Sequence, residues 1–120
     1  MSAPTAPPAG ATGGRVMTLV RFATPGPAPD GAALRALLER TAPVYRSVPG
    51  LLRKWFLSAE GVGGGCYEWR SRADAEAWFD DAWRSRMRAA YGVEPSIEWF
   101  DAPGVVDNLS GQIEFGGSRP

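Results

Sequence analysis

The fold is decided by residues 51–70, LLRKWFLSAEGVGGGCYEWR. Two apolar and aromatic segments, 51–58 and 66–70, are separated by the glycine-rich stretch AEGVGGG at 59–65. Short apolar segments joined through a glycine-containing connection are typical of two strands in a β-hairpin. The sequence therefore predicts a hairpin at the centre of the chain.

An amphipathic helix is predicted on each side of this hairpin. Before it, apolar residues recur at helical spacing up to Val48, with Asp30 as the N-cap and with Pro43 expected to bend the last turns. After it, a start that resembles a capping box at Ser71 leads into a second apolar helix face that continues until Gly92. Each helix therefore has one face that must be buried against another element.

Two further strands complete the pattern. VMTLVRFA at 16–23 carries only one charge, Arg21, and SIEWFD at 96–101 alternates in the manner of a strand. The order strand, helix, strand, strand, helix, strand predicts an α+β fold of the ferredoxin-like β-α-β-β-α-β type, with an antiparallel sheet and both helices on one of its faces. We assign this domain to residues 15–108.

The two ends of the chain differ in composition from this domain. Residues 1–14 consist mainly of Pro, Ala, Gly, Ser and Thr. This composition predicts a disordered tail, because such a segment buries too little apolar surface to offset the entropy of ordering. Residues 109–120 form a second tail, in which LSGQIEF at 109–115 fits a short strand added to the sheet of a partner chain.

Apolar residues occupy both faces of the predicted strands. Trp55 and Leu57 alternate with Phe56 in one strand, and Trp99 alternates with Phe100 in another. Helices that cover only one face of a sheet leave the other face in water unless it packs against something else. A second copy of the sheet is the simplest cover, so the sequence predicts a homodimer with two-fold symmetry.

Composition and charge argue against several classes of function. The 120 residues include thirteen basic and thirteen acidic ones, whereas a nucleic-acid-binding surface requires an excess of positive charge. No apolar run approaches the roughly 18 residues of a membrane span. The first residues lack the features of a secretory signal, and the single Cys66 has no partner for an intramolecular disulfide. We expect a cytoplasmic protein with no nucleic-acid or membrane partner.

Several segments resemble the YdhR-like monooxygenase family, a branch of the dimeric α/β-barrel superfamily that also contains the antibiotic biosynthesis monooxygenases. The most specific are VPGLLRKWFL at 48–57 and YGVEPSIEWF at 91–100, within a resemblance that covers residues 17–108. The resemblance implies a ferredoxin-like protomer, a dimer whose two sheets form a barrel, and a ligand pocket between sheet and helices. Better understood members of the superfamily oxidise electron-rich aromatic substrates with dioxygen and without metal or flavin. Haem degradation, another activity of the superfamily, is set aside because this chain has no histidine.

Aromatic and charged residues on the predicted sheet and helices are the candidates for a site. The aromatic side chains would line an apolar slot for a flat substrate, or else fill the core and the dimer interface. A strand cation, Arg21, Arg53 or Lys54, would stabilise a substrate anion, unless it pairs with a carboxylate of a neighbouring strand. Arg53 and Lys54 are adjacent and so point to opposite faces, which means that at most one of them shares a pocket wall with the helices. Glu68 would be the general base, with an ion pair to Arg53 as the alternative. We assign Arg53, Glu68 and Tyr67 to catalysis and Arg21, Tyr45, Trp55, Trp69, Trp78 and Trp83 to substrate binding.

Together with these assignments, the resemblance implies a cofactor-independent monooxygenase that modifies an aromatic or quinol-like metabolite and needs no cofactor or metal. Its partners would be a small aromatic molecule, dioxygen and a second copy of the chain. A non-oxidative cyclase or isomerase and a non-catalytic small-molecule-binding dimer are the alternatives. Twelve of the thirteen basic residues are Arg, a bias that is typical of GC-rich genomes. The presence of an arginine is therefore weak evidence for a functional site.

Overall fold

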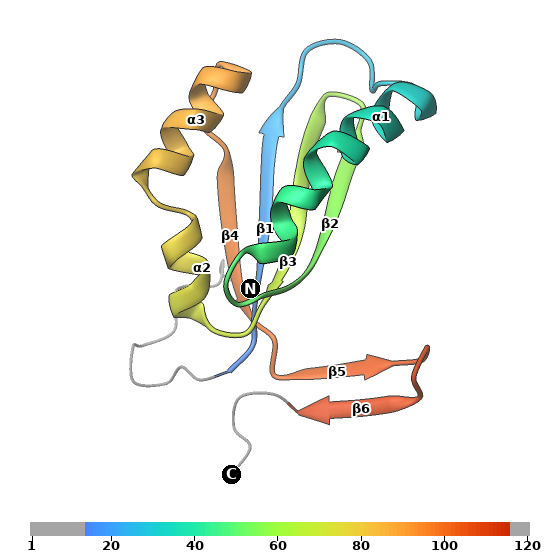
Figure 1. Cartoon of the computed structure of the whole chain (residues 1–120), viewed down its shortest axis with the longest axis vertical. Helices are drawn as coiled ribbons and strands as arrows, with labels where there is room; N and C mark the ends of the chain where they lie inside the picture. Colours follow the sequence, from blue (N-terminus) through green and yellow to red (C-terminus); the bar gives the residue numbers. More distant parts are fainter. Residues whose placement is uncertain (1–13, 116–120) are drawn as a thin grey trace, which may run out of the picture.

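A computed structural model describes residues 14–115, which form one layer of helices on one antiparallel sheet, with a separate two-stranded arm (Figure 1). The helices and strands follow the predicted order as far as the fourth strand. Their bounds are β1 Val16–Ala23, α1 Gly31–Thr41, the 3-10 helix η2 Ala42–Ser47, β2 Leu51–Ala59, β3 Val62–Trp69, α2 Arg72–Trp78, α3 Asp81–Tyr91, β4 Ser96–Asp101, β5 Gly104–Asp107 and β6 Gln112–Phe115.

The main sheet has the strand order β2-β3-β1-β4, and all its neighbours are antiparallel. In Figure 1, α1 and η2 cross the sheet over β2 and β3, while α2 and α3 lie along the side of β4. Tyr67 of β3 contacts Tyr45 of η2 and Phe79 beside α2, so both groups of helices cover the same face. The predicted α+β class and antiparallel sheet are confirmed, and the topology is compatible with a ferredoxin-like fold.

The central hairpin is tighter than predicted. Ala59 pairs with Val62, so only two residues form the turn, and Gly61 adopts a positive φ of 78° there. The glycines at 63–65, which the sequence assigned to the loop, belong to β3. A Cβ at Gly63 would lie 3.3 Å from the ring of Phe22, so glycine serves here to let neighbouring groups approach closely.

The helix predicted between Ser71 and Gly92 is wrong in one respect, because it is broken into α2 and α3. Phe79 leaves the helical conformation at a ψ of 59°, and Asp80 is extended. The Asp80 side chain accepts a hydrogen bond of 2.8 Å from the backbone N–H of Trp83 and so caps a new helix. The break turns both Phe79 and Trp83 into the core.

The sheet face under the helices is the core of the protein. Val16, Thr18 and Val20 of β1 alternate inward beside Tyr67 and Trp69 of β3, and all five are buried. The indole N–H of Trp69 donates a 3.0 Å hydrogen bond to the hydroxyl of Thr18, which removes the cost of burying both polar groups.

The opposite, open face of the main sheet is not covered by this chain. Trp55 and Leu57 of β2 are 46% and 42% exposed there, and Phe100 of β4, at the other edge of the sheet, is exposed as well. β5 and β6 pair only with each other in the described residues and project from one end of the sheet as an arm (Figure 1). Leu109 at the tip of this arm is fully exposed.

The predicted tails are partly described. Of the segment 109–115, the residues from Gln112 to Phe115 do form a strand, but in this single chain it pairs with β5, an element that the sequence did not predict. Residues 1–13 and 116–120 lie outside the described residues. Within the described part, no helix is long and apolar enough to cross a membrane.

Candidate functional site

A small cavity of about 140 Å³ lies between the covered face of the sheet and the helices. Its walls come from β1, β2 and β3 on one side and from α1, η2 and α3 on the other. Aromatic and aliphatic side chains dominate the lining, and one cation joins them. The lining residues include Phe22, Leu38, Tyr45, Lys54, Phe56, Tyr67, Trp83 and Met87.

Lys54 is the cation in this cavity, and aromatic rings surround its amine. The Nζ atom lies 3.5 Å from the ring centre of Tyr45, 4.1 Å from that of Phe56 and 4.6 Å from that of Tyr67. Lys54 forms no ion pair with a carboxylate of residues 14–115. The amine is therefore held by ring faces and not by an opposite charge.

Local structure explains why these groups meet. Lys54 and Tyr67 are register partners in the β2–β3 pair, so their side chains stand on the same face. η2 begins after Thr41 with a proline in its first turn, and this turn carries Tyr45 across the end of α1. Gly65 leaves room for the lysine stem, because a Cβ there would lie 3.0 Å from Cε of Lys54.

Burial shifts the pKa values of the ionisable side chains in the cavity. It lowers the pKa of the Lys54 ammonium group to about 7, since a charged amine loses hydration there. The three ring faces attract the ammonium form and act in the opposite direction. Burial also raises the pKa of the Tyr45 and Tyr67 hydroxyls, so both phenols keep their protons and can donate hydrogen bonds. Near neutral pH the cavity thus holds one amine that can take up or release a proton.

The structure divides the residues that the sequence proposed as one site. Tyr45, Tyr67 and Trp83 line the cavity. Trp69 stacks on Tyr67 at a ring distance of 5.7 Å, and Trp78 contacts Tyr45 edge-on at the same distance, so both support the cavity wall from behind.

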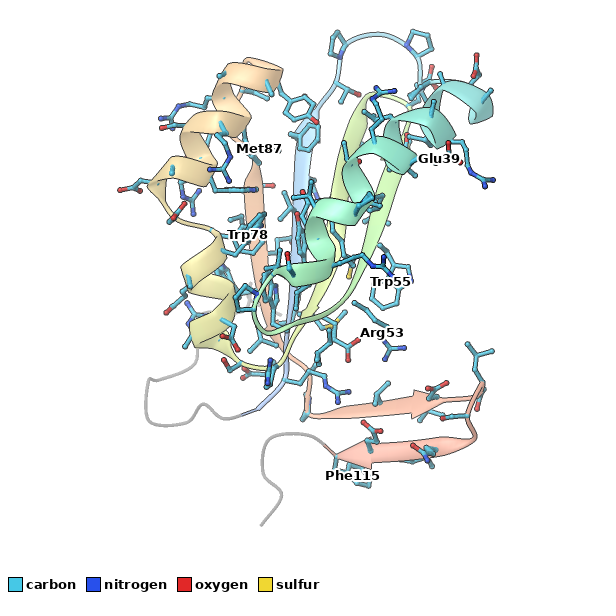
Figure 2. All side chains as sticks on the ribbon, in the orientation of Figure 1. Glu39, Arg53, Trp55, Trp78, Met87 and Phe115 are labelled. Atoms are coloured by element: carbon cyan, nitrogen blue, oxygen red, sulfur yellow. The ribbon has the colours of Figure 1, made fainter. Side chains whose placement is uncertain are left out.

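Arg53, Glu68, Trp55 and Arg21 belong to the open face instead. Figure 2 shows Arg53 and Trp55 beside β2 on the side of the arm, far from Trp78 and Met87 of the helices. Arg21 is exposed and pairs with Glu98 at 3.3 Å. These residues cannot share a cavity with Tyr45 and Tyr67, because successive residues of a strand point to opposite faces.

Glu68 is engaged by two guanidinium groups. Its carboxylate, only 5% exposed, lies 2.7 Å from Nε of Arg53 and 3.1 Å from a terminal nitrogen of Arg15. The ion pair with Arg53 that the sequence left as an alternative is confirmed. Each carboxylate oxygen already faces a guanidinium nitrogen, so Glu68 does not present a free oxygen to a substrate.

A second, more open groove of about 330 Å³ lies where the arm meets the open face. Arg53, Glu68 and Trp55 line it together with Arg15 and residues 104–108. The groove is polar on the side of the ion pairs and apolar on the side of Trp55. It therefore differs in chemistry from the aromatic cavity across the sheet.

The sequence raised Lys54 as one of three strand cations but did not assign it to the site, although two signals pointed to it. It is the only lysine in a chain with twelve arginines. Its position next to Arg53 also placed it on the face opposite to that residue. Among residues 14–115, no group of three or more His, Cys, Asp or Glu side chains is arranged to hold a metal ion.

Comparison with models of known protein families finds no match to this chain, and no curated protein matches its sequence. The resemblance to the YdhR-like family therefore stays a prediction from the segments at 48–57 and 91–100.

Proposed function

We propose that this chain is a cofactor-independent monooxygenase that oxidises a small quinol- or phenol-like molecule in the aromatic cavity. The observation that carries the proposal is the Lys54 amine among three ring faces, without a carboxylate partner among residues 14–115. In this arrangement Lys54 takes the place that the sequence gave to Arg53. Resemblance to the YdhR-like family supports the same reaction class.

Lys54 acts first as a base and then as a counter-ion. Its neutral amine accepts the proton of a substrate hydroxyl, which leaves an ammonium beside the substrate anion. The anion is the electron-rich form that passes an electron to dioxygen, and the water-poor cavity strengthens its attraction to the ammonium. Oxygen insertion then needs no external reductant, because quinol and dioxygen give hydroxyquinone and water.

The size of the cavity limits the substrate. A dry cavity of about 150 Å³ in a protein core holds one benzene molecule. The cavity beside Lys54, at about 140 Å³, therefore suits a single aromatic ring. The hydroxyls of Tyr45 and Tyr67 are the donors that orient a polar substituent on that ring.

We also propose that the enzyme works as a homodimer in the cytoplasm. Each chain has an apolar open face around Trp55 and Leu57 and an arm with apolar side chains such as Ile113 and Phe115. One chain therefore offers both the surface that needs a cover and the element that can provide it. Such self-complementarity is what a two-fold interface requires. The coupling of two sheets into a barrel is part of this proposal.

Oxygen uptake by the metal-stripped protein tests the proposed reaction. We expect uptake with hydroquinone or methylhydroquinone above the rate of heat-denatured protein, and a product that has gained one oxygen and lost two hydrogens. Lys54→Met should lower the rate about 100-fold, the usual contribution of a general base. Arg40→Met removes an exposed cation of α1 and should leave the rate unchanged.

Other results would point away from oxidation. Saturable quinol binding without oxygen uptake would favour a non-catalytic binding protein, and a product of unchanged mass would favour an isomerase. An equal rate in wild type and Lys54→Met would remove Lys54 from the chemistry.

A further inference from the structure

We propose that Lys54 captures small aromatic aldehydes or ketones by forming an imine inside the aromatic cavity. This activity goes beyond the oxygenase proposal and does not depend on it, because imine formation uses neither dioxygen nor an electron. The proposal concerns the amine as a nucleophile, whereas oxidation requires it only as a base and a charge.

The identity of residue 54 as the single lysine supports this proposal. Every other basic residue of the chain is an arginine, whose guanidinium stays protonated in proteins. An ammonium can lose its proton when it is buried, and a neutral amine is then a nucleophile. The chain thus places its one lysine at a half-buried position among aromatic rings, which favours the neutral form.

The aromatic surroundings of the Lys54 amine also support this proposal. A carboxylate partner would hold Lys54 in the charged form, and the described residues provide none. Tyr45, Phe56 and Tyr67 present ring faces to the amine, and Gly65 leaves the stem free of a side chain from the next strand. The cavity that this amine faces holds about one ring, so an aryl carbonyl compound is the matching size.

The step balances without a further reactant. The Lys54 nitrogen attacks the carbonyl carbon, the carbonyl π pair becomes a hydroxyl after proton uptake, and loss of water gives the imine. Tyr45 and Tyr67 keep their protons because burial raises their pKa, so they can hydrogen-bond to the carbonyl oxygen as negative charge develops on it. One amine and one carbonyl group are consumed, and one water is released.

Reductive trapping tests the proposal on the full chain. Benzaldehyde and cyanoborohydride at pH 7 should attach one benzyl group to Lys54, located by peptide mass mapping. Only the N-terminal amine competes, because the chain has no second lysine. At that pH a folded pKa of about 7 gives Lys54 about 1,000 times the neutral fraction of an ordinary lysine. We expect labelling at least about tenfold faster in the folded chain than in the urea-unfolded chain, after allowance for restricted access.

Three variants separate the outcomes. Lys54→Arg and Lys54→Met should lose the internal adduct and keep the N-terminal one, with circular dichroism to verify that each is folded. Arg53→Lys combined with Lys54→Arg moves the lysine to the open face and should label no faster when folded than when unfolded. Labelling of the N-terminus alone, or equal rates for Lys54 in folded and unfolded wild type, would overturn the proposal. Either result leaves the oxygen-uptake test unaffected.

Discussion

On the covered face of β2, the Nζ atom of Lys54 lies 3.5 Å from the ring centre of Tyr45. On the open face of the same strand, the guanidinium of its neighbour Arg53 lies 5.7 Å from the ring centre of Trp55. Both cations contact an aromatic face, but within the part of the chain that the structure describes only Arg53 also pairs with a carboxylate. The covered face therefore holds an amine whose charge depends on pH, and the open face holds a fixed ion pair. The two faces of β2 thus have different electrostatics within one dipeptide.

Replacing Lys54 by Met should stabilise the protein most at low pH. The folded pKa of about 7 lies below the ordinary value of 10.5, so the folded state binds fewer protons than the unfolded state between these values. The cost of burying the ammonium is therefore fully present below pH 7 and disappears as the pH rises toward 10. The stability difference between Lys54→Met and wild type should shrink by about 1 kcal/mol per pH unit over this range.

Urea unfolding at pH 6, 7.5 and 9 measures this difference. Tyr45, Tyr67 and Tyr91 are the titratable groups that the other elements bring near the cavity, and they are present in both proteins, so their effects largely cancel. Lys54→Arg is the matched control, because its charge persists and its difference from Met should stay constant. A pH-independent difference between wild type and Lys54→Met would show that the buried amine does not titrate in this range.

Gly65→Ala should narrow the cavity without replacing any of its polar side chains. The new methyl group would lie 3.0 Å from Cε of Lys54 and 3.2 Å from the backbone oxygen of Trp55. The lysine stem must then move, and overpacking of this kind costs about 1–3 kcal/mol. Imine trapping and quinol oxidation should both fall. Gly31→Ala, whose Cβ meets nothing within 4 Å, should leave both unchanged. Unaltered trapping in Gly65→Ala would place the reactive amine outside the cavity.

Glu68→Gln should reduce stability more than Arg53→Gln does. Glu68 is buried and holds two cations, so its neutral replacement leaves Arg53 without a charged partner and Arg15 with Glu114 alone, at a cost of about 1–3 kcal/mol. Arg53→Gln leaves Glu68 paired with Arg15, and the half-exposed guanidinium contributes about 1 kcal/mol or less. Thermal unfolding of both variants at low and high salt gives the comparison. Equal losses would mean that Arg15 contributes little to the pairing.

The sequence predicted the elements of the main sheet because their patterns are local. Alternating strands, a glycine turn and capped amphipathic helices each depend on a few neighbouring residues. It missed the break at Phe79 because the periodic apolar face continues through that residue, and only the competing N-cap at Asp80 ends the first helix. It also assigned Gly63–Gly65 to a loop, since glycine is common in turns and the close approach of Phe22 is visible only in three dimensions.

The site was predicted only in part, because the sequence does not show which face of the sheet the helices cover. Strand alternation established that Arg53 and Lys54 face opposite sides, but it could not tell which side the helices cover. Of the residues assigned from the sequence, Tyr45, Tyr67 and Trp83 line one cavity. Arg53 was preferred over Lys54, but Glu68 neutralises the charge of Arg53. The sequence could not show this ion pair, because pairing across strands depends on the register of β2 with β3.

Trp55→Glu should prevent two chains from associating. Trp55 is 46% exposed on the open face of the edge strand β2, and a stable dimer typically buries about 1,200–2,000 Å². Sedimentation equilibrium at micromolar concentration should give twice the chain mass of 12.8 kDa for wild type and the chain mass for Trp55→Glu. Val44→Glu is the control, because this residue is 61% exposed on η2, on the helix side of the sheet, and its replacement should leave the dimer intact. A wild type that sediments as a monomer would contradict the proposed dimer. The open face and the arm would then serve some other contact.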